Sequence, residues 1–172
     1  MTNPAAKRIH LLAFDVDGVL TDGTILLGAN GDELKAFNVK DGLGLARATR
    51  AGLVVAFISG RRSPSVARRA QELGVPHCIQ NCNDKQRALE QLTASLELQR
   101  DEVAFVGDDL NDLPAFAASG LRIAVADAAP ELKRAADVVT RCKGGHGAAR
   151  EVVEMILKAR RAWNPRTSKE GP

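Results

Sequence analysis

Short, almost entirely apolar runs alternate with segments of helical periodicity along most of this 172-residue chain. The three most apolar runs are residues 9–14 (IHLLAF), 53–58 (LVVAFI) and 102–106 (EVAFV). A strand without polar alternation is usually buried on both faces, as in a parallel sheet that helices cover on both sides. The sequence therefore predicts an α/β fold with a doubly wound, Rossmann-like parallel sheet and helices on both faces.

The segments between and after these runs fit the same plan. Asp41 and Ser63 stand at predicted helix N-caps, and Pro64 occupies the first position of its helix. Residues 24–39 read as a β-hairpin after the first strand, with Asn30-Gly31 in the turn. The remaining predicted strands are 75–80, 121–126 and 137–140, and the remaining predicted helices are 85–96, 111–119, 129–136 and 148–163.

The length and the lack of an internal linker predict one domain over residues 8–163, with residues 164–172 as a flexible tail. Aromatic residues make up 3% of the chain and the net charge is only +3, which argues against a nucleic-acid partner. The apolar run near the N-terminus is too short for a signal or a membrane span, so we expect a cytoplasmic protein without a membrane partner. The three cysteines do not match a zinc motif and are interpreted as packing residues.

Three carboxylates, Asp15, Asp17 and Asp22, follow the first apolar run in the stretch FDVDGVLTDG. Asp15 and Asp17 are one residue apart, a spacing that places both on one face of a strand, where like charges repel. Either this is a polar turn, or a cation lies between the two carboxylates. Asp22 is interpreted as a turn residue that leads into the hairpin.

Polar groups also end the other apolar strands: Ser59 and Gly60 follow residues 53–58, and Asp108 and Asp109 follow residues 102–106. Lys85 begins a predicted helix. Because ligands bind at the carboxyl ends of parallel strands, we expect these groups to converge on one crevice. Each has an ordinary interpretation as a turn, a helix cap or a solvated lysine, and their joint occurrence in this order favours a site.

Carboxylates without histidine or thiolate favour a hard cation, and Mg²⁺ is the expected one, shared between the protein and a substrate phosphate. Lys85, the hydroxyl of Ser59 and backbone amides would hold the other phosphoryl oxygens. One carboxylate of the Asp15–Asp17 pair can act as a nucleophile, and its neighbour can protonate the leaving oxygen and later activate water. The predicted chemistry is phosphoryl transfer through an aspartyl phosphate.

In order along the chain, AFDVDG, FISGR, Lys85 and VGDDLND resemble the four motifs of the haloacid dehalogenase phosphatase superfamily, across roughly residues 9–156. The resemblance implies that Asp15 is the nucleophile and a Mg²⁺ ligand. Asp17 would be the general acid/base and would bind the metal through its backbone carbonyl. Asp108 would be the third protein ligand.

The same resemblance implies that Ser59, Gly60 and Lys85 hold the phosphoryl oxygens. Asp109 and Asp112 would support the site, by orienting metal-bound water or by positioning Lys85. A signalling receiver domain also combines acidic residues, Mg²⁺, a hydroxyl and a lysine, but the D-x-D-G pair and the late GDDLND argue against it.

Within the superfamily, five segments resemble the 3-deoxy-D-manno-octulosonate 8-phosphate phosphatases, which act on an eight-carbon sugar-acid phosphate in lipopolysaccharide biosynthesis. These segments are DVDGVLTDG, the hairpin leading to FNVKDGLGL, SGRRSPSVARRAQELGV, VGDDLNDLP and GGHGAAREV. The alternative substrate is a nine-carbon, sialic-acid-type sugar-acid phosphate. Arg61 is a candidate partner for the substrate carboxylate, and Asp41 is a candidate substrate contact by analogy.

The intervals from Asp17 to Ser59 and from Ser59 to Lys85 are too short to hold a cap domain. An uncapped crevice admits water freely, so another element must cover it. The resemblance implies a homotetramer in which hairpins pack together and a neighbouring subunit helps to close each site. The glycine-rich residues 143–147 (KGGHG) are either a flexible cap of the last helix or a segment that approaches a neighbour's site.

Overall fold

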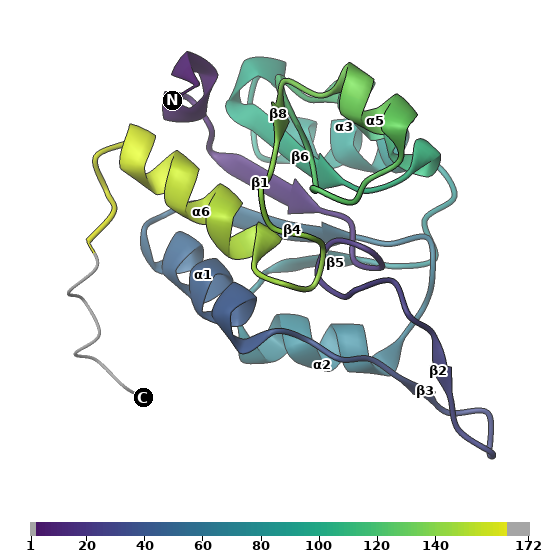
Figure 1. Cartoon of the computed structure of the whole chain (residues 1–172). Coiled ribbons are helices and arrows are strands. Elements are labelled where there is room, and N and C mark those ends of the chain that lie inside the picture. Colours follow the sequence, from purple (N-terminus) through teal and green to yellow (C-terminus); the bar gives the residue numbers. More distant parts are fainter. Residues whose placement is uncertain (1–2, 165–172) are drawn as a thin grey trace.

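The structure, a computed structural model, describes residues 3–164. Its centre is a six-stranded sheet in which every neighbouring pair of strands is parallel (Figure 1). In spatial order the strands are β5 (His77–Ile79), β4 (Val54–Ile58), β1 (Leu11–Phe14), β6 (Val103–Gly107), β7 (Leu121–Ala124) and β8 (Val138–Val139). The predicted doubly wound parallel sheet is confirmed.

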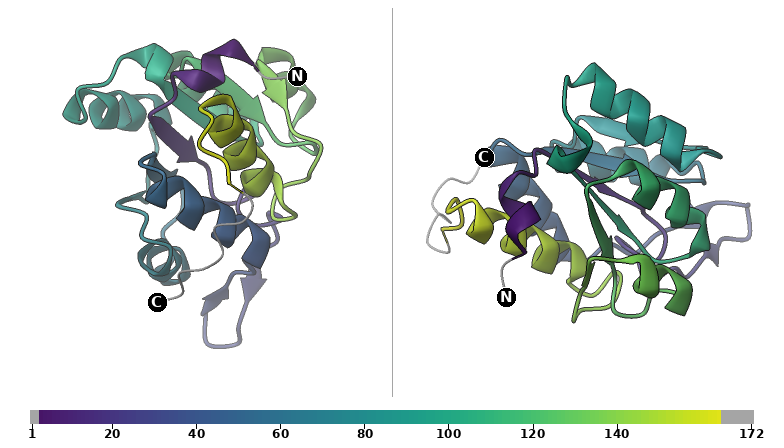
Figure 2. Two further views of the ribbon diagram at one scale, coloured as in Figure 1. Left: turned by 90° about the vertical axis from the view of Figure 1, so that its left-hand side faces the viewer. Right: turned by 90° about the horizontal axis from the view of Figure 1, so that it is seen from above.

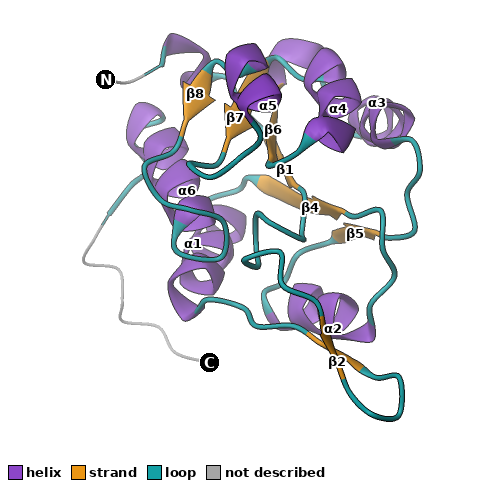
Figure 3. Cartoon of the chain, turned by 45° about the vertical axis from the view of Figure 1, so that its right-hand side comes forward, coloured by secondary structure: helices purple, strands orange, loops and turns teal. Residues whose placement is uncertain are grey.

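Helices cover both faces of this sheet (Figures 2 and 3). On one face lie α1 (Val39–Arg50), α2 (Pro64–Glu72) and α6 (Ala148–Ala159), and on the other lie α3 (Lys85–Ser95), α4 (Leu113–Ala118) and α5 (Pro130–Ala135). Three short 3₁₀ helices complete the helical elements: η1 (Pro4–Lys7), η2 (Arg100–Glu102) and η3 (Leu110–Asp112). Among residues 3–164, no helix is long and apolar enough to span a membrane.

The strand order reverses direction at the centre of the sheet, next to β1. From β1 the chain moves through α1, β4, α2 and β5 toward one edge, and then crosses to β6 on the other side of β1. A crevice forms at the carboxyl ends of the strands where the direction reverses. The fold thus places the end of β1 and the end of β6 side by side.

The central strands are apolar because both of their faces pack against helices. All four residues of β1 are fully buried, and so are Phe57 on β4 and Phe105 on β6. The ring of Phe105 meets Phe116 of α4 edge to face, with 6.3 Å between ring centroids. Packed side chains on both faces make the strand ends a rigid platform for the polar groups that follow.

The hairpin after the first strand is present, but its ladder is shorter than the predicted 24–39. It pairs β2 (Leu26–Leu27) with β3 (Glu33–Leu34), and Gly28 N donates to Asp32 O at 2.7 Å across the turn. The hairpin projects from the body of the molecule (Figure 1). Between the first motif and β4 the described chain contains only this hairpin and α1, so the expectation of no cap domain is also confirmed.

Two predicted helix boundaries were wrong. Asp41 is not the N-cap of its own helix, because α1 begins at Val39 and the side chain of Asn38 caps it by accepting from Lys40 N. The last helix ends at Ala159, before the predicted residue 163, and Trp163 folds back against the cations of α1 and α6. Of the predicted tail 164–172, all but Asn164 lies outside the described residues.

Candidate active site

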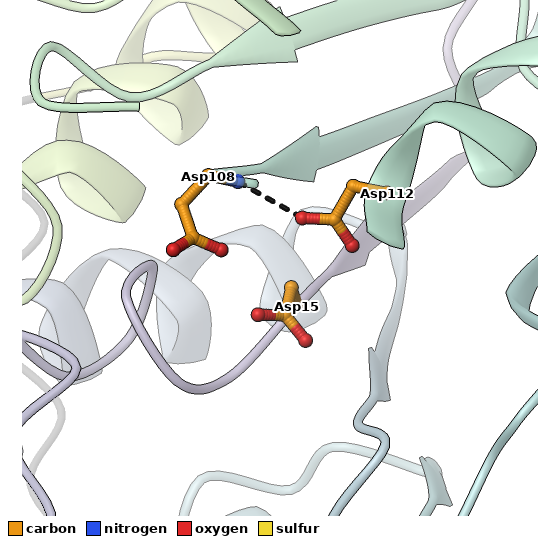
Figure 4. A group of neighbouring side chains, drawn as sticks. All are labelled: Asp15, Asp108 and Asp112. Atoms are coloured by element: carbon orange, nitrogen blue, oxygen red, sulfur yellow. Dashed lines mark hydrogen bonds between the residues drawn. The ribbon is translucent and has the colours of Figure 1, made fainter. Parts of the chain in front are cut away.

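Asp15 is the first residue after β1 and continues that strand's ladder, since Asp15 N donates to Val106 O at 2.9 Å. The residue is only 4% exposed. Its carboxylate lies close to those of Asp108 and Asp112, which follow β6 (Figure 4). The buried backbone therefore holds this carboxylate at the reversal point of the sheet.

Lys85 reaches the same place from the first position of α3, where Asp84 caps the helix by accepting from Arg87 N. Its Nζ lies 2.6 Å from Asp15 Oδ1 and 2.7 Å from Asp112 Oδ1. Burial disfavours the ammonium ion, but these two carboxylates outweigh that effect, and the pKa of Lys85 lies above its ordinary value. Lys85 is therefore charged at neutral pH, with both partners in hydrogen-bond contact.

Asp112 lies at the end of η3 and is fully buried. One of its oxygens contacts Lys85, and the other accepts from Asp108 N at 2.9 Å (Figure 4). It therefore ties the lysine to the loop that follows β6. The sequence-based expectation that Asp112 positions Lys85 agrees with this geometry.

Asp15, Asp108 and Asp112 each present a carboxylate oxygen within 4.8 Å of the other two. Burial and the nearby Asp112 raise the pKa of Asp15 to about 6, although Lys85 opposes the shift. Burial and the charges of Asp15 and Asp112 raise the pKa of Asp108 to about 8. A single lysine does not balance the charge of three ionised carboxylates. The ligands in this cluster are all oxygen atoms, which suits a hard divalent cation such as Mg²⁺.

Gly18 lets the loop after β1 approach this cluster closely. Its φ is +92°, and a Cβ built there would lie 2.0 Å from Asp108 Oδ2. A side chain at this position would displace the Asp108 carboxylate. The glycine of the D-x-D-G motif is therefore required by the geometry of the site itself.

Asp17 meets a residue that the sequence analysis missed. Its carboxylate oxygen Oδ1 accepts a short hydrogen bond from Lys35 Nζ, which also lies 2.9 Å from Glu33 Oε1. Glu33 in turn pairs with Arg61, which follows β4. Nothing local in the sequence marks Lys35, because it reaches Asp17 only through the folded position of the hairpin's base beside the loop after β1.

Ser59 and Gly60 follow β4, the strand next to β1, as predicted. Ser59 is 2% exposed, and its hydroxyl accepts a hydrogen bond from Arg61 N at 3.2 Å. The hydroxyl therefore fixes the turn after β4, in the same row of strand ends as Asp15. The side chain of Arg61 is 47% exposed and points to Glu33 rather than into solvent alone.

Two predicted site residues use their side chains as helix caps. Asp109 is exposed and caps η3 by accepting from Leu110 N at 2.8 Å. Asp41 is 2% exposed and its two oxygens accept from Gly147 N and Arg150 N, at the start of α6. The structure thus engages both carboxylate oxygens of Asp41 in capping α6, and its role as a substrate contact stays a prediction.

The glycine-rich residues 143–147 pack against the loop after β1 of the same chain. Gly145 N donates to Val19 O at 2.9 Å, and Asn38 Nδ2 donates to Gly145 O at 3.1 Å. A Cβ at Gly144 would lie 1.6 Å from Gly18 O. This segment is therefore an ordered support for the D-x-D-G loop, and Gly144 and Gly145 are required by close backbone approach.

Comparison with known proteins agrees with this geometry. Residues 79–152 match the model of the haloacid dehalogenase-like hydrolase family. The 3-deoxy-D-manno-octulosonate 8-phosphate phosphatase of Yersinia pestis is 49% identical over 154 residues, which cover 90% of this chain and 82% of that protein. The protein of the same name from Escherichia coli strain K12 is 48% identical with the same coverage.

Solved structures extend the comparison to three dimensions. The 3-deoxy-D-manno-octulosonate 8-phosphate phosphatase of Moraxella catarrhalis, in complex with magnesium, phosphate and a KDO molecule, has a TM-score of 0.89 and 46% identity, covering 91% of this chain and 90% of that one. The cobalt-bound form from Haemophilus influenzae has a TM-score of 0.88 and 42% identity, covering 91% of each chain. The chain thus belongs to the haloacid dehalogenase-like hydrolases, in the family of 3-deoxy-D-manno-octulosonate 8-phosphate phosphatases, and is a phosphoric monoester hydrolase.

Proposed function

We propose that this protein is a Mg²⁺-dependent phosphatase that hydrolyses 3-deoxy-D-manno-octulosonate 8-phosphate to the free sugar acid and phosphate, a reaction of lipopolysaccharide biosynthesis. The observation that carries the reaction type is the contact of Lys85 with Asp15 and Asp112 beside Asp108, at the carboxyl ends of β1 and β6. The choice of substrate is supported by relatives and by the sugar acid and phosphate bound to the Moraxella protein.

In the first step, an oxygen of Asp15 forms a bond to phosphorus while the bond between phosphorus and the sugar oxygen breaks. Asp17 donates its proton to that sugar oxygen, which leaves as a hydroxyl group. In the second step, Asp17 takes a proton from a water molecule whose oxygen attacks the phosphorus. Asp15 departs as a carboxylate and phosphate is released.

Lys85 would hold a phosphoryl oxygen and offset its charge, because it already lies in contact with the attacking carboxylate of Asp15. The hydroxyl of Ser59 and the amide of Gly60, at the adjacent end of β4, would donate hydrogen bonds to the remaining phosphoryl oxygens. Asp112 holds Lys85 in place and links it to Asp108.

The carboxylates of Asp15 and Asp108 and the backbone carbonyl of Asp17 would hold Mg²⁺, with Asp112 next to them. The donor set fits, because it consists of oxygens alone. The pKa values of Asp15 and Asp108 are raised, and a bound cation would lower them by stabilising the ionised carboxylates. When bound, Mg²⁺ supplies positive charge that offsets the phosphoryl oxygens and the carboxylates. Asp109, exposed on η3, has at most an outer supporting role.

The hairpin supports the further proposal that the enzyme is a homotetramer whose subunits pack through this element. Leu26 and Leu34 form a cross-strand pair, 49% and 60% exposed, and Leu27 is 71% exposed. Such a patch is unusual on a monomer surface. Multi-angle light scattering should give the mass of a tetramer, and a monomeric mass would disprove the proposal.

We also propose that residues 8–163 act as one folding unit in the cytoplasm. One cluster of buried side chains joins all layers of the described chain, and its three cysteines are free thiols, which suits a reducing compartment. A single cooperative unfolding transition that coincides by circular dichroism and tryptophan fluorescence is the expected result.

The activity is tested by phosphate release from a panel of eight- and nine-carbon sugar-acid phosphates, with and without Mg²⁺. The highest kcat/KM is expected for 3-deoxy-D-manno-octulosonate 8-phosphate in the presence of Mg²⁺. Asp15→Asn should abolish turnover, and Asp109→Asn is the matched control that should retain it. Preference for a nine-carbon substrate would replace the proposed substrate, and near-normal turnover by Asp15→Asn would remove the proposed nucleophile.

A further inference from the structure

Lys35 has an unusual position for a hairpin residue, because its side chain is 1% exposed. It lies immediately after β3, and its ammonium group is held by two carboxylates, those of Asp17 and Glu33. A buried ammonium ion is stable only with such partners. The environment of Lys35 therefore depends on its contact with the strand-end loop that carries Asp17.

The alternation of side chains along β3 explains how the hairpin supplies this group. Glu33 and Lys35 are two residues apart and lie on one face of the hairpin, toward the strand ends. Leu34, between them, lies on the opposite face and is 60% exposed. One face of the hairpin is thus polar and directed at the site, and the other is apolar and exposed.

A chain of ion pairs anchors this polar face at both ends. Asp17 contacts Lys35, Lys35 contacts Glu33, and Glu33 contacts Arg61 in the turn after β4. The turn is itself held by the hydrogen bond from Arg61 N to Ser59 Oγ. Lys35 therefore lies between two carboxylates, and Glu33, its partner within the hairpin, is itself tied to the turn after β4.

We infer that Lys35 is a positioning residue for Asp17, an inference that rests on the phosphatase function proposed above. Lys35 contacts Oδ1 of the carboxylate, so Oδ2 is the oxygen left to exchange a proton with the leaving sugar oxygen. A carboxylate held at one oxygen keeps the other in a single orientation, and proton transfer depends on that orientation. The hairpin thus contributes to the proton-transfer step from within the same subunit.

Substrates with different leaving groups distinguish a role in proton transfer from a purely structural role. An alkyl oxygen, as in a sugar phosphate, needs a proton as it departs, whereas p-nitrophenolate departs without one. The ratio kcat/KM includes only the steps up to formation of the aspartyl phosphate, so the later hydrolysis step does not enter. Loss of positioning should therefore reduce kcat/KM for a sugar phosphate far more than for p-nitrophenyl phosphate.

Lys35→Met keeps the length of the side chain and removes its charge. We expect kcat/KM for 3-deoxy-D-manno-octulosonate 8-phosphate to fall by about 10- to 100-fold, and that for p-nitrophenyl phosphate by less than about 3-fold. Lys35→Arg should recover most of the loss. Lys40→Met, which changes an exposed lysine of α1, is the matched control and should leave both values unchanged.

Equal losses for the two substrates, or no loss for either, would overturn the inference. If Lys35→Met does not fold, as judged by circular dichroism, the same kinetic comparison is made with Glu33→Gln. This variant removes the second carboxylate that holds Lys35. That variant must show the same selectivity for the sugar phosphate, and an equal loss for both substrates rejects the inference. A wild-type protein that hydrolyses neither substrate would instead refute the phosphatase proposal, and this inference with it.

Discussion

The Nζ of Lys85 lies 2.6 Å from Asp15 Oδ1, although the two residues are 70 positions apart in the sequence. Asp15 ends the central strand and Lys85 begins α3, so the contact joins the two halves of the sheet at the point where the strand order reverses. Both side chains are almost fully buried. The carboxylate proposed to attack phosphorus and the cation proposed to bind the phosphoryl group are therefore in contact in the folded chain.

Replacement of Lys85 by methionine should separate its two roles. We expect kcat/KM for the sugar phosphate to fall by about 10²- to 10³-fold, because one preorganised charge on the phosphoryl group is lost. Without Mg²⁺ the variant should also be less stable, because Asp15 and Asp112 remain buried without their counter-ion. Urea unfolding with and without Mg²⁺ measures the second effect.

Added Mg²⁺ should recover more stability in Lys85→Met than in the wild type, because the cation would replace the missing charge near the carboxylates. Lys40→Met provides the control for loss of a lysine outside the site. An equal response to Mg²⁺ in Lys85→Met and wild type would contradict the proposed arrangement of charges.

The metal-free protein should lose stability as the pH rises from 5 to 8. The folded-state pKa values of Asp15 and Asp108, about 6 and about 8, lie above the ordinary value of 3.8. Between these limits the folded state binds more protons than the unfolded state, so the free energy of unfolding decreases with pH. Differential scanning fluorimetry in EDTA should show a melting temperature that falls by a few degrees across this range.

The opposite slope is expected for the effect of Mg²⁺. Because the cation needs ionised carboxylates, the gain in melting temperature on adding Mg²⁺ should increase from pH 5 to pH 8. Asp108→Asn should flatten the metal-free slope, whereas Asp109→Asn, at the exposed neighbouring position, should preserve it. A metal-free slope that Asp108→Asn leaves unchanged would show that other groups cause it.

Alanine at Gly144 should damage the site through the backbone. The added Cβ would lie 1.6 Å from Gly18 O, so the D-x-D-G loop must shift away from its support. We expect a loss of about 1–3 kcal/mol in the free energy of unfolding, together with a clear fall in kcat. Chemical denaturation and steady-state kinetics measure the two effects.

Gly74→Ala is the comparison for Gly144→Ala. Gly74 has a φ of +65°, and a Cβ there would meet no atom within 4 Å, so this variant imposes backbone strain without a steric clash. It should lose about 1 kcal/mol of stability and keep its kcat. Full activity in Gly144→Ala would mean that the glycine-rich segment does not support the loop.

Asp41→Ala should destabilise the protein without changing the chemistry. The carboxylate accepts from Gly147 N at 3.0 Å and from Arg150 N at 2.8 Å, and alanine would leave both donors at the start of α6 unsatisfied. We expect a loss of about 1–3 kcal/mol in the free energy of unfolding. Asp41→Asn, which retains one acceptor oxygen, should lose less.

Steady-state kinetics on the folded fraction of Asp41→Ala should give a KM close to that of the wild type. A large increase in KM with unchanged stability would instead support Asp41 as a substrate contact.

The local pattern of the sequence was sufficient to predict the sheet, the strand ends and most of the helices. Apolar strands and N-cap residues can be recognised from a few neighbouring residues in the sequence. The motifs lie at the boundaries of helices and strands, at Asp15, Ser59, Lys85 and Asp108. The reversal rule for parallel sheets then predicts that these boundaries meet. The proximity of Lys85, Asp15 and Asp112 follows from that rule.

Contacts made by long side chains and by closely packed backbone were decided by the tertiary structure alone. Asp41 looked like the cap of its own helix, yet it caps α6, whose first turn packs more than 100 residues away in sequence. Lys35 carries no local signal, and it reaches Asp17 only because the base of the hairpin lies beside the loop after β1. Sequence periodicity predicts the face of a helix or strand on which a side chain lies. The residues that this face contacts depend on how the whole chain packs.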